Sequence, residues 1–286
     1  MEERAEKNQV FGMSDVVRQL QTDQIRAQMG ANLPVSTIPL PSRGLVYPAD
    51  SALHGLETVE LKAMTVQEEN ILTSKALIKK GTVITELIKS CIVNKAIDVG
   101  QMLSGDRNTL MVAIRSEGYG HLYDVEVRCA ACGESAEQQF NLNEFELKPL
   151  ELAPLEVGKN EFPFRLPKCG KNVTFRFLTG RDEEDIVATQ ENRKKGLKGG
   201  GATVLDDSLI LQLQYALVSV EGNYSKNDIS NFVRTMFARD SQELRKYIQK
   251  HQPGINMVQN ITCPHCEHTE NGVAMPIGIN FFWPNQ

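Results

Sequence analysis

Apolar residues recur at helical spacing in separate stretches of the chain. One set follows the i, i+3, i+4, i+7, i+8 pattern and consists of Ile84, Leu87, Ile88, Cys91 and Ile92. Further sets are Leu209, Ile210, Leu213 and Leu217, then Ile229, Phe232, Val233, Met236 and Phe237. The spacing predicts amphipathic helices that each bury one face against a core. Because Cys91 lies on such a face, we expect its thiol to belong to the core.

Strand-like alternation surrounds two Cys-x-x-Cys motifs, Cys129-Ala-Ala-Cys132 and Cys263-Pro-His-Cys266. The stretches that precede and follow the motifs are residues 122–127, 138–142, 257–262 and 274–282. Alternation of this kind predicts strands. Each motif is therefore expected in a tight turn between two strands, which is the layout of a zinc knuckle.

The two motifs end two copies of one longer pattern. The same interval separates Asp106 from Asp240, Leu110 from Leu244, Ile114 from Ile248 and Cys129 from Cys263. Nearer the start of the copies, as between residues 59–65 and 173–179, the interval is shorter. Loop insertions in the second copy would produce this change, and they are expected in the polar or glycine-rich stretches 194–201 and 221–226. The pattern predicts an internal duplication.

The predicted fold class is α+β, with two pseudo-symmetric lobes that each combine helices with a strand–Cys-x-x-Cys–strand knuckle. Residues 51–150 would form the first lobe and residues 151–286 the second. Residues 1–50 stand outside the repeat as an N-terminal arm, with a loosely amphipathic helix and then a Pro-rich extended segment. Such an arm has no core of its own. It is either a disordered tail or docks in trans on a neighbour in an assembly.

Acidic residues mark the expected helix starts. The capping-box pattern occurs at Thr65-x-x-Glu68 and, in a weaker form, at Thr179-x-x-Asp182. Asp106 and Asp240 each stand where a following helix begins, so we expect them to be N-caps. Negative charge is stabilised at a helix start by the helix dipole. These carboxylates are therefore explained without an active site.

Four thiolates held in two tight turns can complete a tetrahedron around one zinc ion. The predicted ligands are Cys129, Cys132, Cys263 and Cys266. The ion would be shared if the pseudo-symmetry brings the knuckles together; otherwise His265 or His268 would have to complete a separate second site. Gly133 can adopt a left-handed conformation after the first pair. Glu267 holds the equivalent place in the second, so that turn must differ or carry strain.

Two other interpretations of the cysteines are open. A redox pair usually has its first Cys at a helix N-terminus, and neither motif here precedes a helical pattern. Alternatively, the cysteines are small buried residues without a ligand. The charged N-terminus is unlike a signal peptide, so we expect a protein made and kept in a cytosol. In that compartment paired cysteines favour metal or redox chemistry over disulfides.

Composition and motifs exclude several classes of function. The net charge of −5 argues against broad binding to a phosphate backbone, although a local basic patch stays open. Apolar runs fall short of the roughly 18 residues that span a bilayer, so no membrane insertion is expected. The chain has no phosphate loop, dinucleotide fingerprint or Ser/His/Asp arrangement. We therefore expect neither an enzyme nor a small-molecule substrate.

Several motifs resemble the baseplate hub proteins of T-even-like contractile-tailed bacteriophages. They are Leu-Pro-Ser-Arg-Gly-Leu-Val-Tyr-Pro at 40–48, Met-Thr-Val-Gln-Glu-Glu-Asn-Ile-Leu at 64–72, Leu-Ile-Lys-Lys-Gly at 77–81, Ala-Arg-Asp-Ser-Gln-Glu-Leu-Arg at 238–245 and Pro-Ile-Gly-Ile-Asn-Phe-Phe-Trp-Pro at 276–284. The terminal Phe-Phe-Trp-Pro is the most specific of them. The resemblance runs from about residue 34 to the end of the chain.

The resemblance implies a late protein of virion assembly that helps to build the tail baseplate hub, without catalysis. Its partners would be other baseplate and tail proteins, in the host cytoplasm during assembly and, if the protein is retained, in the virion. A structural zinc ion would stabilise it. Phe281, Phe282 and Trp283 would either anchor a partner or seal the second core.

The alternative function is a zinc-ribbon regulatory protein that binds nucleic acid. This alternative predicts a basic face around the knuckles, where Arg128 is the cation close to the first pair.

Overall fold

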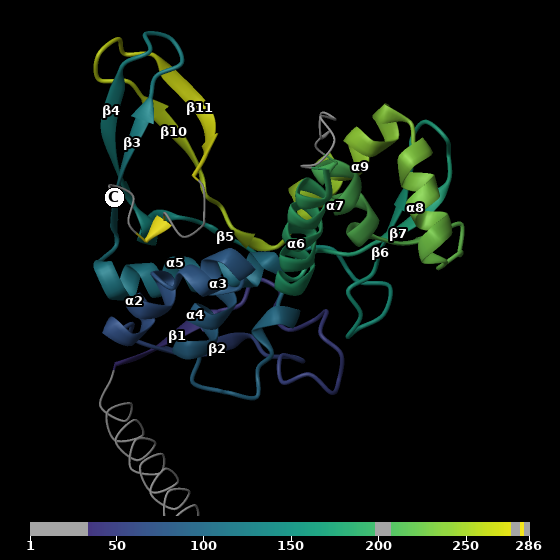
Figure 1. The fold of residues 1–286 in the computed structure, drawn as a ribbon, viewed down its shortest axis with the longest axis horizontal. Helices are drawn as coiled ribbons and strands as arrows, with labels where there is room; N and C mark the ends of the chain where they lie inside the picture. The colour runs from purple at the N-terminus through teal and green to yellow at the C-terminus, as the bar shows by residue number, and fades with distance from the viewer. Residues whose placement is uncertain (1–33, 198–206, 276–280, 283–286) are drawn as a thin grey trace, which may run out of the picture.

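The computed structural model describes residues 34–197, 207–275 and 281–282, and in this part of the chain it confirms a mixed α+β fold. Two helical bodies lie side by side, and a β arm stands on the first of them (Figure 1). The elements of the first body are β1 (Val35–Pro39), β2 (Thr58–Lys62), α2 (Val66–Leu72), α3 (Lys75–Lys80), α4 (Val83–Cys91), η1 (Val99–Gln101) and α5 (Ser104–Tyr119). The predicted core thiol of Cys91 is fully buried, which raises its pKa to about 12.

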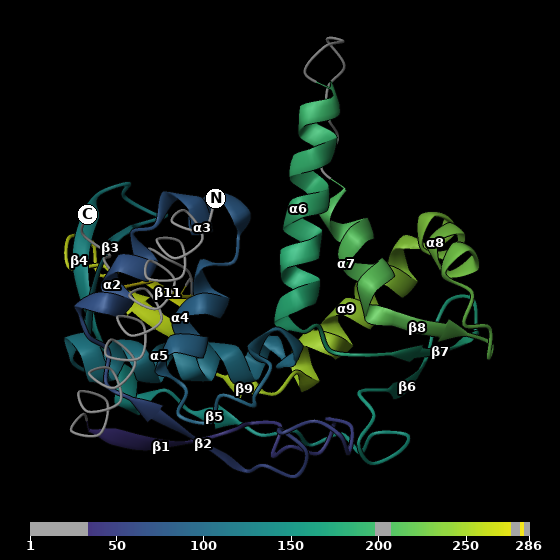
Figure 2. The ribbon, with the colours of Figure 1, turned by 60° about the horizontal axis from the view of Figure 1, so that its bottom comes forward.

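The second body is a three-stranded antiparallel sheet with four helices. Its elements are β6 (Phe162–Arg165), β7 (Asn172–Phe175), α6 (Gly180–Leu197), α7 (Ser208–Ala216), β8 (Leu217–Val220), α8 (Lys226–Thr235) and α9 (Ala238–His251). Helix α6 extends away from the rest of the molecule (Figure 2). Leu217, expected on a helical face, instead starts β8.

The arm consists of two antiparallel hairpins that come from distant parts of the chain. Strands β3 (Leu122–Arg128) and β4 (Ser135–Asn141) form one, and β10 (Val258–Thr262) and β11 (Thr269–Ala274) form the other. The short strands β5 (Leu147–Lys148) and β9 (Gly254–Ile255) pair near the base of the arm. A short 3-10 turn, η2 (Leu142–Glu144), follows β4.

Both predicted capping boxes are present, and each is tied to the strand before it. The Glu68 carboxylate accepts hydrogen bonds from the Thr65 N–H and hydroxyl and pairs with Lys62 of β2 at 2.9 Å. In the second body, Asp182 accepts the same two bonds from Thr179 and pairs with Arg176, which follows β7, at 2.5 Å. Each box thus fixes its helix to the strand that leads into it.

The prediction that Asp106 and Asp240 are N-caps is wrong. Leu103 and Phe237 are the N-caps, and each aspartate lies in the first turn and is fully buried. The two carboxylates do not cap their helices. They accept hydrogen bonds from the N–H groups of other chain segments, for which the described residues offer no other acceptor.

Each buried aspartate holds a turn of the form Leu-Pro-x-x-Gly. Asp106 accepts bonds from the Ser42 N–H at 2.9 Å, the Ser42 hydroxyl at 2.6 Å and the Tyr47 hydroxyl at 2.5 Å. Asp240 accepts from the N–H groups of Lys168 at 2.6 Å and Cys169 at 3.1 Å. Burial raises the pKa of Asp106 above its usual value. These carboxylates satisfy the backbone donors of the two turns, of which the Ser42 N–H is buried and the Lys168 and Cys169 N–H groups are partly buried.

The second half of the chain crosses the first at a point of backbone contact. A Cβ atom on Gly105, in the first turn of α5, would lie 1.7 Å from the Pro253 carbonyl oxygen. Only glycine therefore allows α5 to lie against the segment that leads into β9. This crossing carries β10 and β11 from the second body to the arm on the first.

Phe281 and Phe282 are buried, but not where the sequence placed them. The Phe281 ring packs on Tyr123 of β3 with the centroids 4.9 Å apart. Arg115 of α5 donates from Nε to the Phe281 carbonyl and from Nη1 to the Gly120 carbonyl. The pair therefore contacts the first half of the chain, at the base of the arm.

Other expectations are corrected or fall outside the described residues. The strand after the second Cys pair is β11, which ends at Ala274, and α6 continues to Leu197 through part of the loop expected at 194–201. Residues 276–280 of the strand expected at 274–282, and the rest of that loop, lie outside the described residues. The N-terminal helix expected before residue 34 and Trp283 lie outside the described residues. Among the described residues, no helix is long and apolar enough to cross a membrane. The division of the chain into lobes at residue 150 stays a prediction.

The Glu68 ion pair predicts a pH-dependent contribution to stability. Burial raises the pKa of Glu68, but hydrogen bonds from Ser90, Thr65 and Lys62 outweigh it and lower the pKa from 4.5 to about 2. Stability from Glu68 is therefore present above pH 4.5 and lost as the pH falls towards 2. We expect Glu68→Gln to lower the free energy of unfolding by about 2 kcal/mol at pH 7.

Urea denaturation of both proteins at pH 7 and at pH 3 measures this effect, and the difference between them should shrink at the lower pH. Glu60→Gln, at an exposed position of β2, is the matched control and should show no such difference. A Glu68→Gln deficit that stays constant with pH would contradict the assignment.

The crossing of α5 predicts that alanine has opposite effects at two glycines of this helix. Gly105→Ala should destabilise by at least about 3 kcal/mol, because the Pro253 backbone must move. In Gly118→Ala the new Cβ would meet the flexible end of Met64, at 2.9 Å from Cε. That variant should be neutral or more stable by up to about 1 kcal/mol, because alanine favours the helix. Equal denaturation midpoints for the two variants would refute the close crossing.

Candidate metal centre

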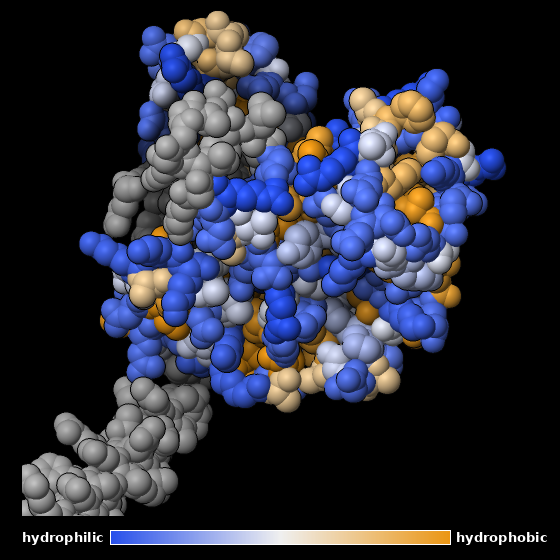
Figure 3. Space-filling view, turned by 45° about the vertical axis from the view of Figure 1, so that its right-hand side comes forward, coloured by the Kyte–Doolittle hydropathy of each residue, from blue (hydrophilic) through white to orange (hydrophobic). Residues whose placement is uncertain are grey.

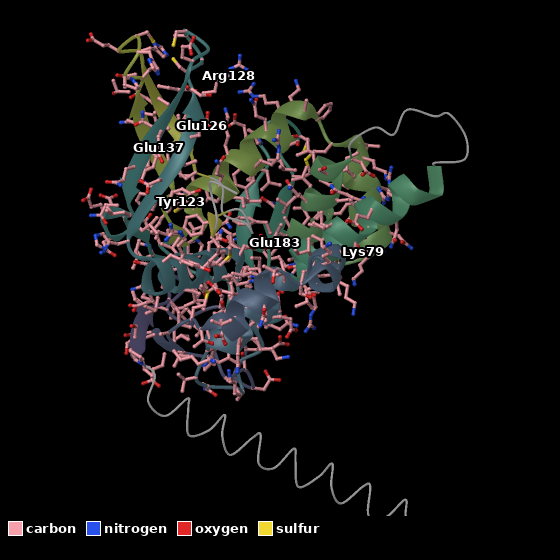
Figure 4. The ribbon with its side chains drawn as sticks, turned by 60° about the vertical axis from the view of Figure 1, so that its left-hand side comes forward. Lys79, Tyr123, Glu126, Arg128, Glu137 and Glu183 are labelled. Carbon is pink, nitrogen blue, oxygen red and sulfur yellow. The ribbon has the colours of Figure 1, made fainter. Side chains whose placement is uncertain are left out.

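Two turns meet at the tip of the arm. The first joins β3 to β4 and carries Cys129 and Cys132; the second joins β10 to β11 and carries Cys263 and Cys266. Figure 4 shows sulfur atoms at this tip, with Arg128 just below them and Tyr123 near the base of the arm. The expectation that each motif lies between two strands is thus confirmed.

The two turns are closed by matching backbone hydrogen bonds. The Cys129 N–H donates to the Glu134 carbonyl at 2.9 Å, and the Cys263 N–H donates to the His268 carbonyl at 2.9 Å. Within each turn the residue after the second Cys donates back to the carbonyl of the first, at 3.0 Å from Gly133 and 2.9 Å from Glu267. The two motifs therefore form the same type of turn, and each turn holds its two cysteines in the same way.

The expected strain at Glu267 is present. Gly133 has a φ of 78° and Glu267 a φ of 60°, so both adopt the left-handed conformation that favours glycine. A glutamate held there stores conformational strain. The second knuckle thus adopts the same turn as the first, although Glu267 disfavours the left-handed conformation.

The sulfur atoms are paired crosswise between the knuckles. Cys129 Sγ lies 3.7 Å from Cys266 Sγ, and Cys132 Sγ lies 3.8 Å from Cys263 Sγ. All four sulfurs lie within 4.8 Å of one another. A tetrahedral zinc site with Zn–S bonds of about 2.3 Å requires sulfur separations of about 3.8 Å. The cluster has the size that one ion needs, and it could hold one metal ion.

The electrostatics of the cluster also favour a cation. The N–H groups of Cys132 and Ala131 lower the pKa of Cys129 to about 6. The N–H of His268 lowers the pKa of Cys266, but desolvation and the neighbouring sulfurs outweigh it and raise that pKa to about 12. Four adjacent thiols cannot all ionise without a compensating positive charge. A bound divalent cation would supply that charge and favour all four thiolates.

The alternatives that the sequence left open can be compared with this geometry. Among the described residues, the group that could hold an ion consists of the four cysteines alone, without His265 or His268. Each knuckle leads into a strand and not into a helix, so neither has the setting of a redox pair. Three of the four cysteines are not buried, so the site is not a set of small core residues.

The surface around the knuckles is acidic. Glu126 and Glu137 are exposed and stand directly opposite each other on β3 and β4 (Figure 4). Arg128, the predicted nearby cation, donates from Nε to the Gly133 carbonyl at 3.0 Å and so supports the first turn. The charges at the arm therefore do not provide a basic face.

Sequence reasoning missed the residues that hold the arm on the first body. The Arg115 side chain is buried and donates to the carbonyls of Phe281, Gly120 and Leu122, which belong to both halves of the arm's base. The one available signal was a single cation next to Ile114 on an apolar helical face. A buried arginine at such a position usually has several fixed acceptors.

Comparison with known proteins gives one match. The family model described as T4 bacteriophage base plate protein matches residues 46–283. No curated protein matches the chain. No solved structure matches it.

The geometry predicts zinc in the purified protein. We expect about one equivalent per chain, with four thiols that react only after a chelator removes the metal. Cys266→Ser should lose most of the zinc and release the arm, because two-stranded hairpins are marginal without support. Cys169→Ser, outside the cluster, should retain it. Elemental analysis, thiol titration and hydrogen exchange of the arm measure these outcomes. Less than about half an equivalent of zinc, with four freely titrating thiols, would refute the site.

Proposed function

This chain belongs to the T4 bacteriophage base plate protein family, and we propose that it is a structural or assembly component of the tail baseplate hub. The observation that carries this proposal is the family match across residues 46–283. The molecule's architecture supports it, because two bodies and a fastened arm offer several surfaces to partners. The partners would be other baseplate and tail proteins, with assembly in the host cytoplasm.

We propose further that a single zinc ion binds Cys129, Cys132, Cys263 and Cys266 and has a structural role. The equal turns and the sulfur separations near 3.8 Å support this assignment. Zinc with four protein ligands has no open position for water or substrate, so the ion would fasten the arm and would not act as a Lewis acid. A chain of this kind would not be an enzyme.

An internal duplication is the third part of the proposal. Three sets of contacts support it: the two capping boxes, the two buried aspartates and the two knuckle turns. Each set uses residues at the intervals read from the sequence. The first lobe would comprise residues 51–150 and the second 151–286. Residues 1–50 stand outside the repeat, but β1 pairs with β2 of the first body, so an arm that docks in trans would be confined to the part before residue 34.

The alternative of a nucleic-acid-binding regulator has little support. It requires a basic surface at the knuckles. The exposed residues there include Glu126 and Glu137, and Arg128 donates a hydrogen bond to the Gly133 carbonyl of the first turn. Phosphate contacts depend on clustered Lys and Arg. No second candidate function is favoured by the arrangement of charges.

Deletion of the gene from the phage that encodes it tests the proposal. We expect the deletion to stop formation of the baseplate hub, and complementation with Cys169→Ser to restore it. Complementation with Cys266→Ser should fail or fall at least about tenfold in plaque yield, because the arm is released. Mass spectrometry of purified particles then separates the two roles: a retained protein is a hub component, and an absent one is an assembly factor. Normal hubs and infectious particles without the gene would refute both roles.

A further inference from the structure

The two bodies meet through a short antiparallel bridge. Leu103 bridges to Thr179, the Ser104 N–H donates to the Leu178 carbonyl at 2.9 Å, and the Gly180 N–H donates to the Met102 carbonyl at 3.0 Å. We call residues 178–180 the docking segment and residues 102–104 the receiving segment. The contact leaves Leu103 only 1% exposed.

The second body contains its own receiving segment, which is uncovered. Under the proposed duplication, Phe237 corresponds to Leu103, and the two residues are the N-caps of α9 and α5. Phe237 is 54% exposed, and Ala238 is exposed where its counterpart Ser104 is 3% exposed. Figure 3, which brings the right-hand side of Figure 1 forward, shows orange apolar patches among the hydrophilic surface. The second receiving segment, residues 236–238, thus presents a half-exposed aromatic ring, with Lys168 Nζ 6.0 Å from the ring centroid.

The first body contains the matching docking segment, residues 64–66, and its Val66 is exposed among the described residues. Thr65 corresponds to Thr179, since each starts a capping box, and Val66 corresponds to Gly180. Val66 is 70% exposed. An exposed valine at the start of a helix gains nothing from solvent, so Val66 offers an apolar contact for a partner, while Met64 packs against the core.

The bridge within the chain combines a small residue on the docking segment with a large residue on α5, and the corresponding exposed positions combine a large residue with a small one. In the bridge within the chain, Gly180 faces Arg107: a Cβ at this glycine would lie 1.4 Å from Arg107 Nη1. At the free positions Val66 replaces the glycine, and Ser241 stands where the duplication places the counterpart of Arg107. The larger side chain on one segment is thus matched by the smaller one on the other. This complementarity favours the free docking segment as the occupant of the free receiving segment.

We propose that copies of this chain associate head to tail, with residues 64–66 of one copy docked on residues 236–238 of the next. This inference rests on the proposed duplication. The contact is heterologous, because each copy uses a different surface, so it produces a ring if the rotation closes and a filament if it does not. The bridge between the two bodies would be repeated between copies.

The contact between copies would depend less on charge than the bridge within the chain. Arg107 of the bridge lies 3.8 Å from both Glu183 and Glu184, and Arg181 pairs with Asp98 at 3.0 Å. The counterparts of Arg107 and Asp98 are Ser241 and Phe232, which carry no charge. Association between copies should therefore change little between low and high salt.

Sedimentation of the purified full chain tests the proposal. We expect the wild type to form dimers and larger species between about 1 and 100 µM, the range of a modest interface. Val66→Asp and Phe237→Asp should each remain monomeric over that range. Val157→Asp and Tyr224→Asp, at positions 72% and 62% exposed, are the matched controls and should associate like the wild type. Both pairs of residues are exposed, so thermal unfolding should be unchanged and should verify that each variant is folded.

Mixing the two monomeric variants is the decisive measurement. Phe237→Asp keeps an intact docking segment and Val66→Asp an intact receiving segment, so the mixture should form a 1:1 dimer that grows no further. Three results would overturn the proposal: a wild type that stays monomeric at about 100 µM, association that survives Phe237→Asp, or a mixture that stays monomeric. Because the purified chain is used, these results are independent of whether deletion of the gene stops hub formation.

Discussion

A two-stranded hairpin has too little buried surface to be stable alone, and this constraint governs the arm. The arm consists of two such hairpins, and the space between them is lined by few apolar side chains, among them Val127 and Ile261. Arg115 and Phe281 hold its base, and the four sulfurs meet at its tip. An ion at the tip would act where the packing is weakest. The cysteines lie at the end of the arm that is farthest from the first body, so an ion bound there would fix the arm at both ends.

The arm also makes the two halves of the chain depend on each other. After α9 the chain leaves the second body, passes α5 at Gly105 through Pro253, and continues into β10 and β11, which complete a structure that stands on the first body. The core reflects this exchange, since Phe281 packs on Tyr123. Two halves that share an arm in this way do not separate into two independent domains. Such an arrangement suits a protein whose surfaces must keep fixed relative positions in an assembly.

The correspondences between the halves are as informative where they fail as where they hold. The aspartates, the capping boxes and the knuckle turns agree between the halves, because each of them satisfies backbone N–H groups at a turn or a helix start. The surfaces around Leu103 and Phe237 differ, because among the described residues Leu103 forms a backbone bridge to the other body, whereas Phe237 is half exposed. Glu267 is a further example. The knuckle requires a left-handed residue after its second cysteine, so Glu267 adopts that conformation although it is not glycine.

Local chemistry is what the sequence by itself determined. Helical spacing, the Thr65 and Thr179 capping boxes and the strand–turn–strand knuckles depend on neighbours within a few residues, and all of them were predictable. The clustering of the four cysteines was predicted only through the repeat. Tertiary structure decided which sulfur faces which, that Asp106 and Asp240 bind distant turns instead of capping their helices, and that Phe281 serves the first half. These contacts join residues far apart in the sequence, and their energies depend on the path of the whole chain, which no local pattern encodes.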